Sequence, residues 1–131
     1  MRLTLDTKNT RAIVANFYAA DQRAQRAIRR VVKASGVRLH EDARSRTPVD
    51  TGFMRSQLRL RYSDGGLVYN VGWDEADFTA AGLVFYPVYV IFGSRGRPAN
   101  DPLFPARDAE APRFDADLRT ALKAAIARRG R

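Results

Sequence analysis

The chain has 131 residues and no cysteine, with 45% hydrophobic and 28% charged residues. This composition indicates a folded single domain over residues 1–131 with a modest core, and it excludes a disulfide framework and thiolate chemistry. The net charge is +9, and 20 of the 23 basic residues are arginine. Such a charge favours anionic partners, namely nucleic acid, an acidic protein surface or anionic lipid, although an arginine-rich face exposed only to solvent is equally compatible with it.

The first part of the chain predicts a short strand followed by two helices. Residues 2–6 read as the strand, and Asn9 or Thr10 could cap a short helix. A long amphipathic helix is expected from about Asp21 to Arg46, because apolar or small residues recur every three or four positions. Its stripe comprises Ala24, Ala27, Ile28, Val31, Val32, Ser35, Leu39 and Ala43. Gly36 within this helix predicts a small kink or close packing.

The long helix is followed by a joint and then by a hairpin. Pro48 ends the helix because proline lacks an N–H, and Gly52 can adopt a positive φ in the turn that follows. Residues 57–63 alternate between apolar and polar side chains, and residues 67–73 return after the turn sequence Asp64-Gly65-Gly66. Each strand has one apolar face, so we expect the hairpin to cover the long helix.

The second half of the chain is less regular in its sequence. Residues 74–82 fit either a helical turn or a loop. The segment Tyr86–Gly93 fits either a strand or a short helix with Pro87 at its first position and Gly93 just past its end. We expect a loop-rich region from Ser94 to Pro112, with a last helix that begins at Pro112 and carries an apolar stripe. That stripe comprises Phe114, Leu118, Ala121, Leu122, Ala125 and Ile126. The predicted class is therefore α+β: a long amphipathic N-terminal helix on a small antiparallel sheet, with a C-terminal helix.

The sequence gives little support for catalysis. His40, the single histidine, lies within the long helix, where a surface or edge position is the expected role. The acidic groups, Glu41 with Asp42 and Asp74 with Glu75 and Asp77, are more typical of solvated carboxylates than of a metal site. The glycine-rich basic loop at residues 93–97 lacks a phosphate-loop pattern. We therefore expect no enzyme activity, no catalytic residue, no metal site and no cofactor. No apolar run reaches the length of a membrane span, so we expect no membrane partner.

Tyr86, Tyr89 and Phe92 lie close to Arg95 and Arg97 in the sequence. Aromatic rings interleaved with arginine can stack on the bases of single-stranded nucleic acid. Core packing under the hairpin is the favoured interpretation, because a small domain needs aromatic side chains for burial.

Two segments resemble the tail-completion proteins of long-tailed bacteriophages, which are also called minor tail-component or head–tail joining (neck) proteins. In the first segment, the matching residues are Pro48, Val49, Asp50, Thr51, Gly52 and Arg55. In the second, Tyr86, Tyr89, Val90, Phe92 and Gly93 match, whereas Pro87, Ile91 and Ser94 depart from the family pattern. The family carries an acid at the position of Ile91, so a salt bridge made by that acid is not expected here. The resemblance covers roughly residues 10–125.

This resemblance implies a structural role without a reaction or cofactor. It implies a homo-oligomeric ring, a hexamer or dodecamer, in the neck of a phage or of a phage-derived gene transfer agent. Its partners would be the neighbouring connector, terminator and tail-tube proteins, with possible non-specific contact to channel DNA, in a virion assembled in the host cytoplasm. The candidate residues for an interface or a DNA channel are Arg59, Arg61, Arg95 and Arg97. The alternatives are a tail terminator ring protein and a small basic nucleic-acid-binding protein of the ribonuclease-like toxin type.

Overall fold

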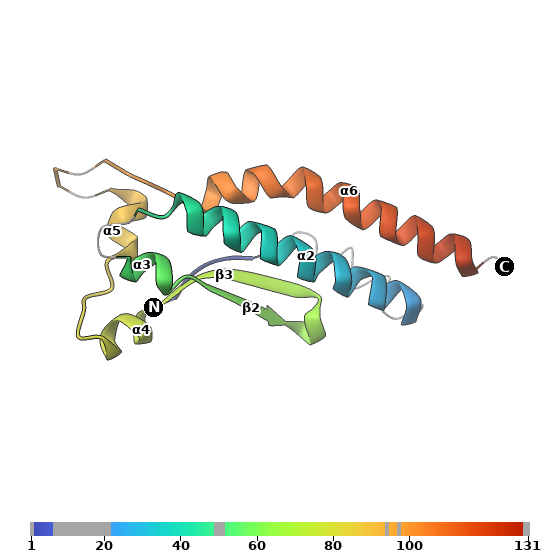
Figure 1. Ribbon diagram of the computed structural model, residues 1–131, viewed down its shortest axis with the longest axis horizontal. Coiled ribbons are helices and arrows are strands. Elements are labelled where there is room, and N and C mark those ends of the chain that lie inside the picture. Colours follow the sequence, from blue (N-terminus) through green and yellow to red (C-terminus); the bar gives the residue numbers. More distant parts are fainter. Residues whose placement is uncertain (1, 7–21, 49–51, 94, 97, 130–131) are drawn as a thin grey trace.

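The computed structural model describes the backbone of residues 2–6, 22–48, 52–93, 95–96 and 98–129 (Figure 1). The predicted α+β class is confirmed, because a long N-terminal helix packs on an antiparallel sheet and a C-terminal helix follows. The helix predicted near Asn9 and Thr10 lies outside these residues. The elements in chain order are β1 (Arg2–Asp6), α2 (Gln22–Arg46), α3 (Phe53–Ser56), β2 (Arg59–Ser63), the 3-10 turn η1 (Asp64–Gly66), β3 (Val68–Asp74), α4 (Glu75–Ala80), α5 (Pro87–Phe92) and α6 (Leu103–Arg129).

Helix α2 lies between the sheet and α6, as Figure 1 shows, and its bounds agree closely with the prediction. Its predicted stripe is the buried face, with Ile28, Val32 and Ala43 fully inaccessible to solvent. Gly36 sits where the sheet comes closest. A Cβ atom at this position would lie 3.1 Å from Leu60 Cδ1 and 3.2 Å from Tyr69 Cγ. The close packing expected at this glycine is therefore confirmed.

The sheet has three strands in the order β1–β3–β2, and both pairings are antiparallel. Leu60 pairs with Val71 across the hairpin, and Leu3 pairs with Trp73 on the other side of β3. The central strand β3 is buried over most of its length, including Val68, which points to the face opposite Tyr69. The sequence predicts a two-stranded hairpin in which apolar and polar side chains alternate. The third strand, β1, makes β3 central, so side chains on both faces of β3 are buried.

Both ambiguous segments of the second half are helical. Residues 75–80 form α4, and the helical alternative for Tyr86–Gly93 is confirmed by α5. Pro87 occupies the first turn of α5, where its missing N–H costs nothing. Gly93 follows the helix with φ of 82°, a conformation that side chains on other residues disfavour. The strand alternative is wrong because these two residues set helical boundaries.

The last helix begins nine residues earlier than predicted, so the expectation of a loop-rich region up to Pro112 is wrong for residues 103–112. Asp101 Oδ1 accepts hydrogen bonds from the backbone N–H of Leu103 at 2.8 Å and of Phe104 at 3.2 Å. This carboxylate caps the helix, so proline in the first turn is compatible with it. Pro112 lies inside α6 on its exposed side. Packing along α2 keeps the helix continuous despite this proline.

Helix α6 runs antiparallel to α2 and lies beside it over most of its length, with its last turns extending beyond the start of α2 (Figure 1). Its buried residues are Leu103, Ala106, Glu110, Phe114, Leu118 and Ala125. Within the described ranges, no helix combines the length and the apolar content that crossing a membrane requires.

Candidate assembly surfaces

The first motif segment closes the C-terminal end of α2. Thr47 Oγ1 donates to the carbonyl of Ala43 at 2.7 Å, and Thr47 is buried. Arg55 Nε donates to the carbonyl of Arg44 at 3.0 Å, and Arg55 Nη2 donates to that of Ser45 at 3.2 Å. The last carbonyls of a helix lack intrahelical partners, and a cation near them also complements the helix dipole. Arg55 therefore stabilises the fold at this joint.

The same segment is also tied to the sheet. Gly52 has φ of 80°, which confirms the positive φ predicted there, and its carbonyl accepts from the Ser56 N–H at 3.0 Å. Trp73 Nε1 donates to the carbonyl of Met54 at 2.8 Å, and both side chains are buried. Pro48 follows α2 as predicted. Val49, Asp50 and Thr51 lie outside the described residues, so the capping role expected for Asp50 and Thr51 stays a prediction.

An aromatic cluster links the two motif segments. The fully buried ring of Phe78 on α4 meets three others edge-on, at centroid distances of 5.1 Å to Phe53, 5.3 Å to Phe85 and 5.1 Å to Tyr86. Edge-to-face pairs stabilise beyond the area that they bury. Tyr86 thus packs in the core, as the sequence indicated.

The outward side of α5 is apolar and exposed. Tyr89 and Phe92, three positions apart on the helix, are 56% and 64% exposed, while Pro87 and Ile91 point into the core. The core packing predicted for Tyr89 and Phe92 is therefore wrong. We call the exposed apolar side chains of this part of the chain the α5 surface; they are Leu83, Val84, Tyr89 and Phe92.

The α5 surface belongs to a stretch with an unusual composition. No charged residue occurs from Phe78 to Ser94, in a chain of which 28% is charged. Val84 is the most exposed large apolar residue of the described chain, at 73%. Aromatic enrichment together with depletion of charge is typical of the core of a protein–protein interface. The composition of this surface therefore resembles that of an interface core.

The arginines proposed for an interface or a DNA channel differ in their contacts and exposure. Arg59 makes two hydrogen bonds of 2.6 Å to Asp77, and these bonds raise the pKa of Arg59. Arg61 forms an ion pair with Asp74. Each carboxylate competes with any external anion for its arginine. Arg95 is exposed, and Arg97 lies outside the described residues.

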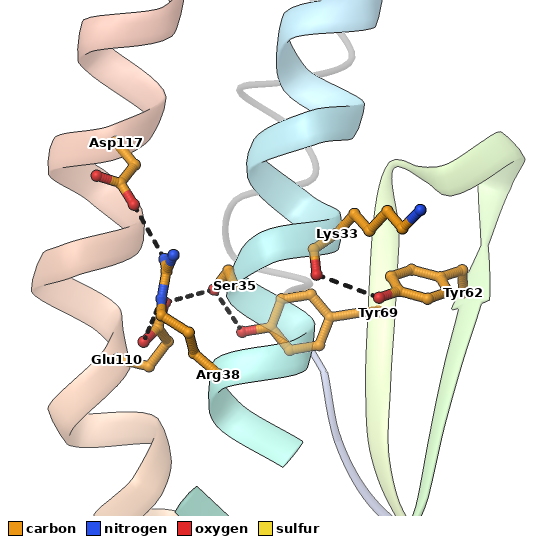
Figure 2. A network of polar contacts seen from close by, with 7 residues as sticks. All are labelled: Lys33, Ser35, Arg38, Tyr62, Tyr69, Glu110 and Asp117. Carbon is orange, nitrogen blue, oxygen red and sulfur yellow. Dashed lines mark hydrogen bonds and ion pairs between the residues drawn. The ribbon is translucent and has the colours of Figure 1, made fainter. Parts of the chain in front are cut away.

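A buried polar network between α2, α6 and β3 was not predicted (Figure 2). Glu110 is only 7% exposed, and its Oε1 accepts from Ser35 Oγ at 2.8 Å and from Arg38 Nη2 at 2.7 Å. Arg38 Nη2 also donates to Asp117 Oδ2 at 2.9 Å, and Ser35 Oγ lies 3.1 Å from the hydroxyl of Tyr69. The buried carboxylate therefore has a charged partner and a neutral one.

The pKa values within this network follow from its contacts. Burial raises the pKa of Tyr69, which keeps its hydroxyl neutral, and the hydrogen bond to Glu110 raises the pKa of Arg38. Glu110 lies four residues after Ala106 and four before Phe114, so it belongs to the buried stripe of α6. That position can be recognised only when α6 is extended back to Leu103.

Basic residues gather at the end of the molecule opposite α5. The start of α2, from Arg23 to Lys33, carries five basic residues and no acidic one. Helix α6 has no acidic residue after Asp117, and it then carries Arg119, Lys123, Arg128 and Arg129. Because the two helices are antiparallel, both stretches lie at the same end (Figure 1). We call this region the basic end.

The residues considered for catalysis have structural contacts. His40 Nε2 lies 2.9 Å from the carbonyl of Leu58, which ties the ring to the sheet. Asp42 pairs with Arg46, and Asp74 and Asp77 pair with the strand arginines described above. Across the part of the chain that the structure describes, no three His, Cys, Asp or Glu side chains are grouped to hold a metal ion.

The chain is similar to a known protein family over residues 11–93, well over half of its length. The family's description reads "Bacteriophage HK97-gp10, putative tail-component". The matched region contains both motif segments, the α5 surface, all of α2 and the strands β2 and β3, whereas β1 precedes it and α6 follows it. No curated protein and no solved structure matches the chain.

Proposed function

The chain belongs to the HK97 gp10-like family of phage tail components, and from this premise we propose that it joins head to tail as a ring-forming neck or tail-completion protein. Membership in the family supports a structural role in the virion, in contact with other tail proteins. We propose that this role involves no enzymatic reaction. We further propose that the chain forms a single domain over residues 1–131, that it assembles into a ring and that this ring joins the head to the tail.

One observation carries the proposal: residues that match the family's second motif face outward. Tyr89 and Phe92 are more than half exposed, although they lie in a segment without any charge. Exposed aromatic groups of this kind mark surfaces that a partner covers. In a closed ring each copy needs two different surfaces that fit one another, and the α5 surface supplies an apolar one.

The partners follow from this arrangement. We propose a homo-oligomeric ring, a hexamer or dodecamer, that contacts the neighbouring connector, terminator and tail-tube proteins. Arg59, Arg61, Arg95 and Arg97 remain candidates for contact with these neighbours or with channel DNA. Arg59 and Arg61 would have to exchange their carboxylate partners to make such contacts. Such exchanges would make binding sensitive to salt.

Deletion of the gene in the phage or prophage that carries it tests the joining role. We expect DNA-filled heads and separate, complete tails in electron micrographs of the lysate. Supplying the wild-type gene in trans should restore joined particles. Normal joined particles without the gene would contradict this proposal, and tails of irregular length in place of complete ones would favour a tail terminator ring.

The basic end favours a second candidate, a nucleic-acid-binding protein. Counterion release from a phosphate backbone would then dominate the affinity, so the logarithm of the binding constant should fall linearly with that of salt concentration. Duplex DNA and RNA binding at physiological salt measures this, with Arg26→Gln and Arg30→Gln as variants of the basic end and Arg95→Gln and Arg97→Gln as variants of the segment after α5. Absence of binding would remove the candidate.

A further inference from the structure

The basic end contains a groove between the start of α2 and the last part of α6. Its volume is about 800 Å³. The residues that line it are Arg23, Arg26, Ala27, Arg30, Val31, Ala121, Ala124 and Ala125. The groove exists because small side chains face each other here, whereas Leu39, Phe114 and Leu118 fill the space between the helices elsewhere. Its floor is therefore shallow and mostly alanine.

The wall of the groove on α2 is a row of arginines. Arg23, Arg26 and Arg30 follow one another at spacings of three and four, so they lie along one side of the helix over about 10 Å. Among the described residues no carboxylate lines the groove. The positive charge of Arg26 and Arg30 in this wall therefore favours an anionic partner.

The combination of wall and floor selects the kind of partner. A DNA duplex could meet the arginines with its phosphates, but it would leave the alanine floor uncovered. A helix with one apolar row fits a floor of alanines closely, and acidic residues beside that row, at spacings of three and four, would meet the arginines. A second copy of this chain would bring an excess of basic residues to this row of arginines, so an acidic helix from another protein is the better match in charge at this groove.

We infer that the groove binds an acidic amphipathic helix of another protein. The floor would bury the apolar row, and the arginines would form ion pairs with carboxylates at the rim and fix the orientation of the helix. This site lies at the other end of the molecule from the α5 surface, and it does not depend on ring formation. It goes beyond the proposed function by giving the chemistry of a partner.

The test uses a fluorescein-labelled synthetic peptide of about 20 residues, long enough to form a helix, with leucines on one face and glutamates beside them. Fluorescence anisotropy with the full-length protein at physiological salt measures its binding. The variant Arg26→Gln with Arg30→Gln should weaken binding about tenfold or more. The control variant, Arg44→Gln with Arg113→Gln, removes the same charge from exposed sites elsewhere and should change binding less than about twofold.

Two further measurements separate the groove from general charge attraction. Ala124→Trp fills the groove at an exposed position without a change in charge, and it should also weaken peptide binding about tenfold. A peptide of the same composition with a shuffled order, and hence no apolar face, should bind much more weakly. Equal binding of the shuffled peptide, equal losses in both arginine variants, or no effect of Ala124→Trp would each overturn the inference.

Two last measurements complete the test: binding of a 20-bp DNA duplex and the assembly state of the variants. If the duplex binds more tightly than the peptide and is insensitive to Ala124→Trp, the basic end is a phosphate-binding surface and the helix site is wrong. Native mass spectrometry of the same variants shows whether they still form rings, so that failure of the ring proposal can be distinguished from failure of the groove proposal. Loss of peptide binding with rings intact supports the groove, and peptide binding without rings counts against the proposed ring alone.

Discussion

The two motif segments share one aromatic cluster but direct their side chains in opposite ways. In the joint after α2, Arg55 and Thr47 turn inward and satisfy backbone carbonyls. On α5, the side chains of Tyr89 and Phe92 turn outward and are more than half exposed. Their resemblance to the family does not show which of the two segments builds the fold and which is available to a partner. Burial and hydrogen bonding separate the residues that build the fold from those that are available to a partner.

Substitution of Phe78, the ring that both segments contact, should have the largest effect on stability. Phe78→Ala removes three edge-to-face contacts and leaves a cavity, so we expect a loss of about 3–5 kcal/mol in the free energy of unfolding, measured in urea. The matched control, Phe92→Ala, removes an exposed ring and should cost less than about 0.5 kcal/mol. Equal losses would contradict the difference in burial.

Gly52→Val tests the backbone of the joint. Apart from the two adjoining residues, no atom of the described part of the chain lies within 4 Å of a Cβ placed at this position, so we expect the cost to come from the positive φ and not from a clash. We expect a loss of about 2 kcal/mol in the same urea experiment. Asparagine tolerates this conformation better than valine, and Gly52→Asn should lose less than half as much. Similar losses for both variants would show that φ is not the cause.

Arg55→Ala tests the cap on α2. It removes two hydrogen bonds to backbone carbonyls at the partly exposed joint, and we expect a loss of about 1 kcal/mol, measured by thermal unfolding. Hydrogen exchange should also become faster in the last turn of α2. The control, Arg44→Ala, removes an equal charge but keeps the carbonyl that Arg55 contacts. If Arg55→Ala is as stable as this control, the cap contributes nothing.

The double variant Tyr89→Ser with Phe92→Ser should have the smallest effect on the folded monomer. Both rings are mostly exposed, so the free energy of unfolding at low protein concentration should change by less than about 0.5 kcal/mol. At higher concentration the wild type should gain thermal stability through association, because assembly stabilises the folded state, and the variant should not. A large loss at low concentration would mean that these rings support the core.

Local signals in the sequence predicted much of the fold. The apolar stripe located α2, the Asp64-Gly65-Gly66 turn located the hairpin, and Pro87 and Gly93 marked α5. The early start of α6 is not predicted because Pro102 and Pro105 suggest an irregular segment and Pro112 suggests the first position of the helix. Their cost is small, since Pro102 and Pro105 lie at the capped start of the helix and Pro112 is exposed.

The remaining features depend on tertiary structure. Glu110 is buried against Ser35 and Arg38, residues more than 70 positions away, so no local pattern predicts this network. The exposure of Tyr89 and Phe92 depends on how α5 is rotated on the core. Composition favours burial for aromatic side chains, and only the packing of Pro87 and Ile91 shows which side of α5 faces outward.

Native mass spectrometry of the purified full-length chain, with and without Tyr89→Ser and Phe92→Ser, tests most directly whether the α5 surface is where copies of this tail component associate. We predict a closed ring of one stoichiometry for the wild type and monomers for the double variant, while Val37→Ser, which changes an exposed apolar residue on α2, keeps the ring. A wild type that stays monomeric at all concentrations, or a double variant that forms the same ring, would contradict this role.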